Sequence, residues 1–210
     1  MGIMEKMLKQ AAMPTGRFGA FWARLMNIGH SSVTRWGLGH ISISKSDMVL
    51  DIGCGGGRTV NTLAKIATEG KVYGIDYSQV SVAVSTRKNK KLIEKGQVKV
   101  LHASVDSLPF SDDMFDLVIA VESCYFWPDL INNLKEIRRV LKTGGSAILV
   151  NAMYRDERFE KRNSRLARIG DFTYHSAEEF RGFLRDAGYS SVRIEVLESK
   201  NWIAAIGTNT

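Results

Sequence analysis

Four glycines stand close together after a short apolar run and could offer bare backbone to a nucleotide-like ligand. They lie in Met48–Arg58, which reads MVLDIGCGGGR, at Gly53, Gly55, Gly56 and Gly57. An apolar run before such a loop and a helical pattern after it are the context in which glycine loops bind ligands in α/β proteins. The dinucleotide pattern G-x-G-x-x-G needs a glycine where Arg58 stands, and a P-loop needs Lys followed by Ser or Thr. The loop therefore favours close approach of a ligand to the backbone over the cradling of a phosphate.

An acid follows the next apolar run and has a type and position suited to binding a sugar. Asp76 directly follows the apolar run Val72–Ile75 and lies 19 residues after Gly57. The carboxyl ends of parallel strands meet at one edge of a sheet, so Asp76 is expected beside the glycine loop. A carboxylate accepts two hydrogen bonds from a ribose diol. The alternative is that Asp76 or Ser78 only caps the following helix; we favour ribose binding because the loop and the acid coincide.

Short apolar runs alternate with helical stretches and predict the elements that position these residues. The expected parallel strands, buried on both faces, are Met48–Ile52, Val72–Ile75, Val98–Leu101, Leu117–Val121 and Ala147–Val150. The expected helices between them are Thr59–Thr68, Gln79–Lys95 and Leu130–Leu141. Gly70, Gly96 and Gly144–Gly145 are expected at helix ends. This alternation predicts an α/β, Rossmann-like, doubly wound and mostly parallel sheet.

The two ends of the chain follow different patterns. After the helix Ala177–Ala187, the runs Val192–Leu197 and Trp202–Ile206 predict an antiparallel hairpin that closes one edge of the sheet. At the other end, apolar residues at three- and four-residue intervals from Phe18 to Met26 predict an amphipathic helix. We therefore expect a helical cover over residues 1–45 and a sheet domain over residues 46–210.

Composition excludes several classes of protein. The chain has 210 residues, only two cysteines and a net charge of +7. Cys54 and Cys124 alone make neither a disulfide scaffold nor a zinc site, so no metal is expected. No apolar run exceeds five residues, and the N-terminus lacks a signal-peptide layout, so a cytoplasmic protein without membrane spans is expected. The positive charge could serve nucleic acid, but most of the cations fall on helix ends and in one mixed-sign segment.

Taken together, several motifs resemble the class I S-adenosylmethionine-dependent methyltransferases, in particular the small-molecule, ubiquinone- and menaquinone-type group. The matching segments, in the family's order, are VLDIGCGGGR, VYGIDYS, SVDSLPF, FDLVIAVESCYFWPD and LKEIRRVLKTGG. They run from about Met48 to Asn151, roughly half of the chain. The resemblance implies a seven-stranded sheet, S-adenosyl-L-methionine as cofactor and methyl transfer to a small-molecule acceptor by a monomer or homodimer.

The resemblance also implies roles for single residues in cofactor binding. Asp51 would lie near the methionine amino group, and Asp76 would hold the ribose hydroxyls. Tyr77 would pack on the adenine. Ser104 would accept a hydrogen bond from the adenine amino group, at a position where the family more often has an acid. The remaining residues that would line the cofactor are Gly53, Cys54, Gly55, Val105 and Val121. Thr143 departs from the family, which usually has proline there.

The loop after the fourth strand supplies two of the three candidate catalytic residues. Tyr125, Phe126 and Trp127 could form an aromatic wall beside the sulfonium, or a buried aromatic cluster. Tyr125 carries a hydroxyl and is expected in a wet position. Glu122 is a candidate base, although binding of the cofactor's amino group is favoured for it. His30 in the N-terminal cover is the third candidate.

Alternative functions remain open at this point. An RNA methyltransferase would use the basic surface, but the chain lacks an N-P-P-Y-type motif and an appended RNA-binding module. A non-catalytic S-adenosylmethionine-binding protein would need the same cofactor residues. A dinucleotide-dependent oxidoreductase is disfavoured because Arg58 interrupts the glycine fingerprint.

Overall fold

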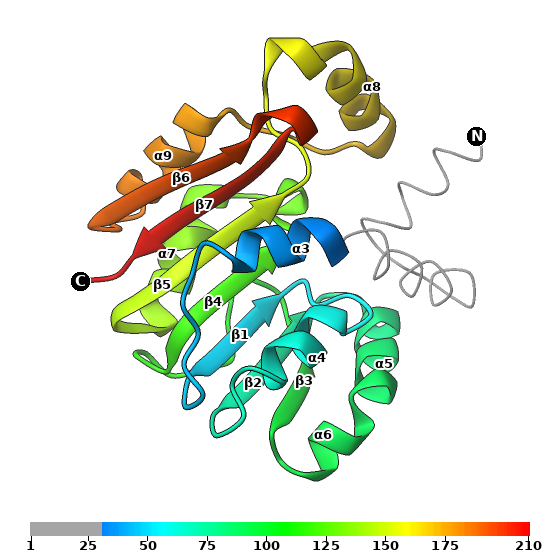
Figure 1. The fold of residues 1–210 in the computed structure, drawn as a ribbon, viewed down its shortest axis with the longest axis vertical. Helices are drawn as coiled ribbons and strands as arrows, with labels where there is room; N and C mark the ends of the chain where they lie inside the picture. The colour runs from blue at the N-terminus through cyan, green and yellow to red at the C-terminus, as the bar shows by residue number, and fades with distance from the viewer. Residues whose placement is uncertain (1–30) are drawn as a thin grey trace.

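A seven-stranded sheet organises the computed structural model, which describes residues 31–210 (Figure 1). The strand order is β3-β2-β1-β4-β5-β7-β6. The strands are β1 (Met48–Ile52), β2 (Lys71–Asp76), β3 (Val98–His102), β4 (Phe115–Val121), β5 (Leu141–Asn151), β6 (Ser191–Leu197) and β7 (Trp202–Thr208). β1 to β5 run parallel, and β7 pairs antiparallel with both β5 and β6. The predicted doubly wound sheet and its C-terminal hairpin are both confirmed.

Helices cover the sheet on both faces, as the alternating pattern predicts. One face carries α3 (Ser31–Leu38), α4 (Arg58–Ala64), α5 (Gln79–Lys88) and α6 (Lys90–Glu94). The other face carries α7 (Leu130–Val140) and α9 (Ala177–Asp186). Successive strand residues alternate between two cores, with Val49 in the core under α4 and Leu50 in the core under α7. Among the described residues, no helix is both long and apolar enough to cross a bilayer.

The expected helix Gln79–Lys95 is divided into α5 and α6 at Asn89. The Asn89 side chain is buried, and its amide donates to the carbonyls of Gly57 and Ser85 at 2.9 and 3.0 Å. Asn61 donates in turn to the Asn89 side-chain oxygen at 3.0 Å. The helix α5 ends here because the Asn89 side chain is hydrogen-bonded to the glycine loop. This contact is long-range, so the helical pattern of the sequence does not reveal it.

The glycines at positions 144 and 145 lie inside β5 and do not end a helix, contrary to expectation. α7 ends at Val140 and β5 begins at Leu141, with a register shift against β4 between Phe115 and Leu117. Gly144 has a φ of 81°, and its N–H donates to the Asn209 carbonyl. The C-terminal segment thus pairs with this irregular part of the strand and extends it.

A helix that the sequence analysis did not identify lies at the carboxyl end of the sheet. The segment between β5 and α9 forms η2 (Glu157–Phe159) and α8 (Glu160–Gly170). Ala167 of α8 packs with Tyr125, Met153 and Tyr174 in a small separate core. α8 is drawn at the top of Figure 1, beyond the ends of β4 and β5.

The described part of the expected N-terminal cover is α3, and it packs directly on the sheet. A Cβ added to Gly37 would come within 2.5 Å of Val150, so the helix lies against β5. Trp36 packs against Trp202 of β7, with ring centroids 5.9 Å apart. Trp36 therefore packs against the core on this face of the sheet. Residues 1–30, including His30 and the predicted helix from Phe18 to Met26, lie outside the described residues.

Replacing Gly57 by Ala is expected to destabilise the fold by about 2 kcal/mol or more. The residue has a φ of 76°, and a Cβ would lie 2.3 Å from Ser85 Oγ and 2.6 Å from Asn89 Nδ2. Gly96→Ala is the matched control, because Gly96 has a φ of 73° but no atom within 4 Å of its added Cβ. The free energy of unfolding of the control should fall only by the cost of a left-handed backbone conformation, about 1–2 kcal/mol. Urea denaturation measures both; equal losses would contradict a packing role for Gly57.

Candidate functional site

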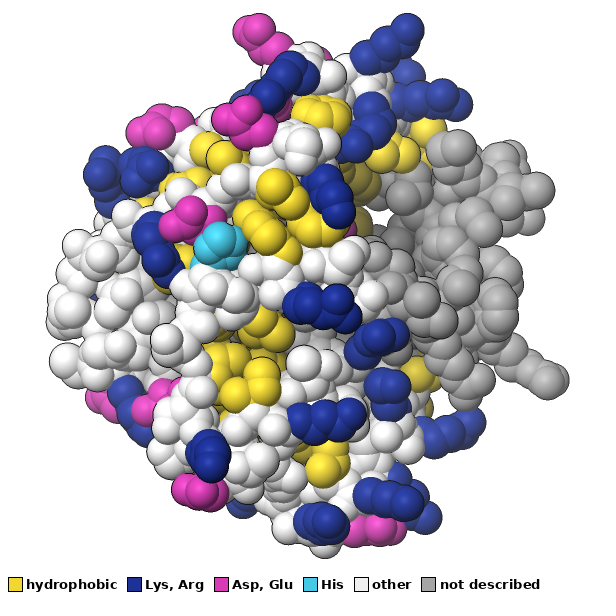
Figure 2. Space-filling model, in the orientation of Figure 1, with side chains coloured by type: hydrophobic (Ala, Val, Ile, Leu, Met, Phe, Trp, Pro, Cys, Tyr) yellow, Lys and Arg dark blue, Asp and Glu magenta, His cyan; other side chains and the backbone are white. Residues whose placement is uncertain are grey.

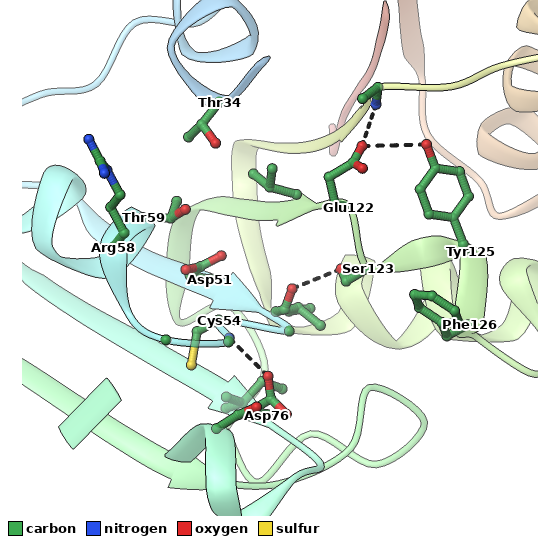
Figure 3. A pocket seen from close by; sticks show the side chains of 18 of the residues that line it. Thr34, Asp51, Cys54, Arg58, Thr59, Asp76, Glu122, Ser123, Tyr125 and Phe126 are labelled. Atoms are coloured by element: carbon green, nitrogen blue, oxygen red, sulfur yellow. Dashed lines mark hydrogen bonds between the residues drawn. The ribbon is translucent and has the colours of Figure 1, made fainter. Parts of the chain in front are cut away.

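A cavity of about 980 Å³ opens at the carboxyl ends of β1, β2 and β4. Its walls come from the glycine loop, from α3 and α4, and from the segments around η1 (Cys124–Phe126) and α8. Figure 3 shows the side chains of Asp51, Arg58, Asp76, Glu122 and Tyr125 around this space. The volume is at the upper end of the range for small-molecule sites, which leaves room for more than one ligand.

The glycine loop is held flat against the end of β2. The N–H groups of Gly53 and Cys54 both donate to the Ile75 carbonyl at 2.9 Å, and Gly55 N–H donates to Asp76 Oδ2 at 2.9 Å. Gly53 has a φ of 71°, and a Cβ there would lie 2.5 Å from the Ser123 side chain. Glycine is required at this position by both the backbone conformation and the close approach of the loop after β4.

Asp51 presents a buried carboxylate to the cavity. The residue is 1% exposed, and its Oδ2 has no hydrogen-bond partner in the structure. Burial, together with the nearby charge of Asp76, raises the pKa of the Asp51 carboxyl to about 8. A cation placed against this oxygen would satisfy the orphaned acceptor and restore the ionised form.

Asp76 is buried beside the loop and already accepts backbone hydrogen bonds. Its Oδ1 accepts from Ser78 N–H at 2.8 Å, and its Oδ2 accepts from Gly55 N–H. Burial raises the pKa of the Asp76 carboxyl, and these backbone donors oppose that shift. The Ser78 side chain accepts from Ser81 N–H at 3.4 Å. Ser78 is thus the residue that caps α5. Asp76 instead binds the glycine loop and faces the cavity.

The other predicted cofactor residues also meet at this cavity. Tyr77 is 41% exposed, and burial of its remaining surface, with the charge of Asp76, raises the pKa of its phenol to about 12. All the remaining predicted cofactor-lining residues are on the wall: Gly53, Cys54, Gly55, Ser104, Val105 and Val121. The structure therefore brings together every cofactor-binding residue predicted from the sequence.

Glu122 is fixed in an unusual backbone conformation at the end of β4. Its φ is 57°, and its N–H donates to the Val150 carbonyl at 2.9 Å. Its Oε1 accepts from Ala152 N–H and from the Tyr125 hydroxyl, the latter at 3.4 Å. These contacts orient the carboxylate along the cavity wall.

The expectation that Tyr125 occupies a wet position is wrong. The residue is 8% exposed, and its hydroxyl donates to the Met153 carbonyl at 3.0 Å. Burial and the nearby Glu122 raise the pKa of the phenol well above its usual value. Its ring packs with Phe126 and Phe172, so this part of the loop forms an aromatic cluster at the cavity wall.

The two cysteines do not approach one another, although they follow neighbouring strands. Cys54 packs in the core under α4 and contacts Ser85 Oγ at 3.8 Å. Cys124 packs in the opposite core and contacts Asn151. Both are free thiols. Within residues 31–210, no group of three or more His, Cys, Asp or Glu side chains has a metal-binding arrangement.

Several cavity residues were missed by the sequence analysis. They come from α8 and the loop after it, and include Arg162, Leu166 and Phe172. No sequence motif marks these residues. Each reaches the cavity through the packing of α8 or of the loop that follows it, which local spacing does not specify.

The cavity fits S-adenosyl-L-methionine, the cofactor that the resemblance implies. The glycine loop leaves a backbone surface that side chains would obstruct, and Asp51 offers an unsatisfied carboxylate oxygen for an ammonium group. Asp76 and the half-exposed Tyr77 lie at the other side of the loop, where a nucleoside could be held. These donors, acceptors and shapes complement an amino acid joined to a nucleoside.

Comparison with known proteins agrees with this geometry. Residues 50–149 match the family described as "Methyltransferase domain". The chain is 27% identical over 125 residues to a Bacillus subtilis protein named uncharacterized methyltransferase YdaC, covering 60% of this chain and 67% of that one. It is 34% identical over 109 residues to demethylmenaquinone methyltransferase of Bacillus mycoides, covering 51% of this chain and 46% of that one. The chain spans about half the length of the curated demethylmenaquinone methyltransferases that it matches.

The fold is also shared with solved structures. An S-adenosylmethionine-dependent methyltransferase from Aquifex aeolicus superposes with a TM-score of 0.73 at 21% identity. The superposition covers 91% of this chain and 98% of that one. At this identity the likeness concerns the fold alone.

Asp51→Asn is expected to stabilise the ligand-free protein, increasingly so at higher pH. A folded-state pKa of about 8 against an ordinary value of 3.8 means that the folded protein retains a proton that the unfolded chain releases. The free energy of unfolding therefore falls as the pH rises from about 4 to 8, and the amide removes that loss. We expect the variant's Tm advantage to grow from near zero at pH 4 to about 5 °C or more at pH 8. Asp106→Asn, at an exposed position outside the cavity, is the control. A Tm difference that is flat with pH would contradict the buried-acid interpretation.

Proposed function

We propose that the chain is a class I S-adenosylmethionine-dependent methyltransferase of the type 11 group and that it methylates a small-molecule acceptor by in-line displacement. The observation that carries the proposal is the unsatisfied Asp51 carboxylate beneath a glycine surface, in a cavity with space beyond it. S-adenosyl-L-methionine, when bound, supplies a methyl group that is already activated on a sulfonium. The protein then has to hold and align two ligands and exclude water.

We assign the cofactor-holding roles to the residues around the loop. Asp51 would bind the amino group and Asp76 the ribose hydroxyls, because each places a buried carboxylate oxygen on the cavity wall. Tyr77 would cover the adenine with its exposed ring, and Ser104 would accept from the adenine amino group. The walls of this half of the cavity are completed by Gly53, Cys54, Gly55, Val105 and Val121.

The acceptor would occupy the part of the cavity beside η1 and α8. Phe126, Phe172 and Leu166 give this part an apolar lining. Glu122 would accept a proton from an acceptor that must lose one, and Tyr125 would act as its positioning residue through the hydroxyl contact. The role predicted for His30 stays a prediction, because that residue lies outside the described part of the chain.

A small molecule fits the site better than RNA. The cavity has helices on two sides, α3 and α8, and an apolar wall of aromatic rings. Lys and Arg side chains are spread over the visible face in Figure 2, with acidic side chains among them. The relatives named demethylmenaquinone methyltransferase support the small-molecule class, and we leave the acceptor's identity to experiment.

Calorimetric titration with S-adenosylhomocysteine should show binding that Asp76→Asn weakens by about 10- to 100-fold. The variant loses a charge-assisted hydrogen bond worth about 1.5–3 kcal/mol. Asp116→Asn is the control, because Asp116 is a half-buried carboxylate at the other end of β4 that accepts from Met48 N–H and Lys142. No binding by the wild type, or preferential binding of NAD, would end the methyltransferase proposal. Equal affinities of the two variants would reject the ribose role of Asp76.

Labelled methyl from S-adenosyl-L-methionine should transfer to the small-molecule fraction of a metabolite extract. Pretreating the extract with nuclease should leave the transfer unchanged, whereas an RNA acceptor would lose it. Glu122→Gln should reduce the transfer rate more than it reduces S-adenosylhomocysteine affinity if Glu122 accepts a proton. Binding without transfer to either fraction would favour a non-catalytic S-adenosylmethionine-binding protein.

A further inference from the structure

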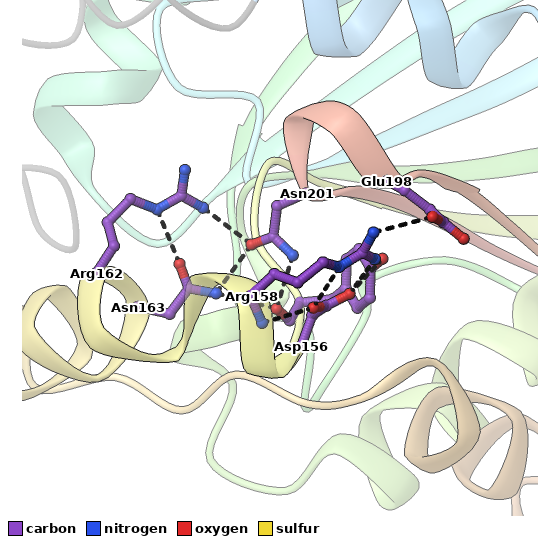
Figure 4. A network of polar contacts seen from close by, with 7 residues as sticks. Asp156, Arg158, Arg162, Asn163, Glu198 and Asn201 are labelled. Atoms are coloured by element: carbon purple, nitrogen blue, oxygen red, sulfur yellow. Dashed lines mark hydrogen bonds and ion pairs between the residues drawn. The ribbon is translucent and has the colours of Figure 1, made fainter.

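Arg162 of α8 lines the cavity and is held in place by neutral partners. Its Nε donates to Asn163 Oδ1 at 3.0 Å, and its Nη2 donates to Asn201 Oδ1 at 2.9 Å (Figure 4). Its guanidinium carbon lies 4.8 Å from the centroid of the Phe159 ring. Both described hydrogen-bond acceptors are amide oxygens, so these contacts orient the guanidinium without neutralising its charge.

The two asparagines that hold Arg162 are themselves buried and fixed. Asn163 and Asn201 are both 0% exposed. Each donates to the Tyr154 carbonyl at 3.0 Å, and Asn163 also donates to Asn201 Oδ1 at 2.8 Å. Asn201 has a φ of 60°, at the turn between η3 (Glu198–Lys200) and β7. Asn163 and Asn201 therefore form a buried hydrogen-bond network that joins α8 to the sheet. This network orients the exposed guanidinium of Arg162 at the cavity.

A neighbouring arginine shows a different arrangement. Arg158, in η2, contacts Asp156 at 2.5 Å and Glu198 at 2.9 Å, so two carboxylates balance its charge at the surface (Figure 4). Arg162 has two of its five N–H groups committed to amides, which leaves three for a ligand. A pre-oriented guanidinium favours planar oxyanions, with which it makes paired charge-assisted hydrogen bonds.

We propose that Arg162 forms an anion subsite for the methyl acceptor, which carries a carboxylate or phosphate group on an apolar body. The inference rests on the proposed function, and it specifies the class of acceptor. The anionic group lies against the Arg162 guanidinium, and the apolar body lies along Leu166, Phe126 and Phe172 on the same side of the cavity. Phe126 and Phe172 pack with ring centroids 5.6 Å apart, which gives this wall a fixed aromatic surface.

The test uses 2-naphthoate, 2-naphthyl phosphate and neutral 2-naphthamide as probes, titrated into the full chain with and without saturating S-adenosylhomocysteine. The wild type should bind at least one anionic probe about 10-fold more tightly than the amide. Arg162→Gln should abolish that preference, and Arg162→Lys should retain part of it because the charge remains without the planar fork. Arg165→Gln, an exposed arginine of the same helix outside the cavity wall, should keep the full preference. The relative affinity of the two anions distinguishes a carboxylate from a phosphate.

Three results of the probe titrations would overturn the subsite. They are absence of an anion preference in the wild type, persistence of the preference in Arg162→Gln, and an equal loss in Arg165→Gln. Weakened S-adenosylhomocysteine binding in Arg162→Gln would also overturn it, because the arginine would then serve the cofactor. Failure of the proposed function is distinguishable, since it would appear as no S-adenosylhomocysteine binding by the wild type while the probe titrations without cofactor still report on Arg162.

Discussion

The arrangement of the site depends on two acids that the pairing of β1 with β2 places close together. Asp51 and Asp76 both lie at the carboxyl edge, and the charge of Asp76 contributes to the raised pKa of Asp51. Backbone N–H groups of Gly55 and Ser78 satisfy Asp76, while Asp51 keeps an oxygen without a partner. Burying an unsatisfied acid costs folding free energy, and a cationic ligand would recover it.

The contacts of the glycine loop fix it in place and account for the division of the predicted helix Gln79–Lys95 at Asn89. Gly57 approaches Ser85 and Asn89 so closely that a side chain at this position would not fit. The Asn89 side chain donates to the Gly57 carbonyl at the point where the predicted long helix is divided. Ser123 packs against Gly53 and donates to the Ile52 carbonyl at 3.0 Å. The glycine loop is thus fixed from both sides, which presents a pre-organised surface to a ligand.

The wall of the cavity beside η1 and α8 is held in place by different contacts from those of the glycine loop. It depends on α8, which reaches the sheet through the buried amides of Asn163 and Asn201 and through the small core around Tyr125 and Ala167. Glu122 is oriented at the boundary between the two halves by Ala152 N–H and by Tyr125. The proposed cofactor half of the cavity therefore rests on the parallel sheet, and the proposed acceptor half rests on the segment between β5 and α9.

The sequence by itself determined the sheet, the glycine loop and the acid that follows β2, because apolar runs, glycines and strand-end acids are local patterns with direct structural meaning; the other proposed cofactor residues were implied by the family resemblance. The five parallel strands and the hairpin could be predicted for that reason, as could the position of Asp76 beside the glycine loop at the carboxyl edge. Only the tertiary structure decided that Asn89 interrupts a helix, that Tyr125 is buried, and that Arg162 reaches the cavity on α8. These features arise from contacts between residues such as Asn163 and Asn201, which are 38 positions apart and carry no local signal. Their physical basis is the satisfaction of buried polar groups, which becomes defined only when the elements pack.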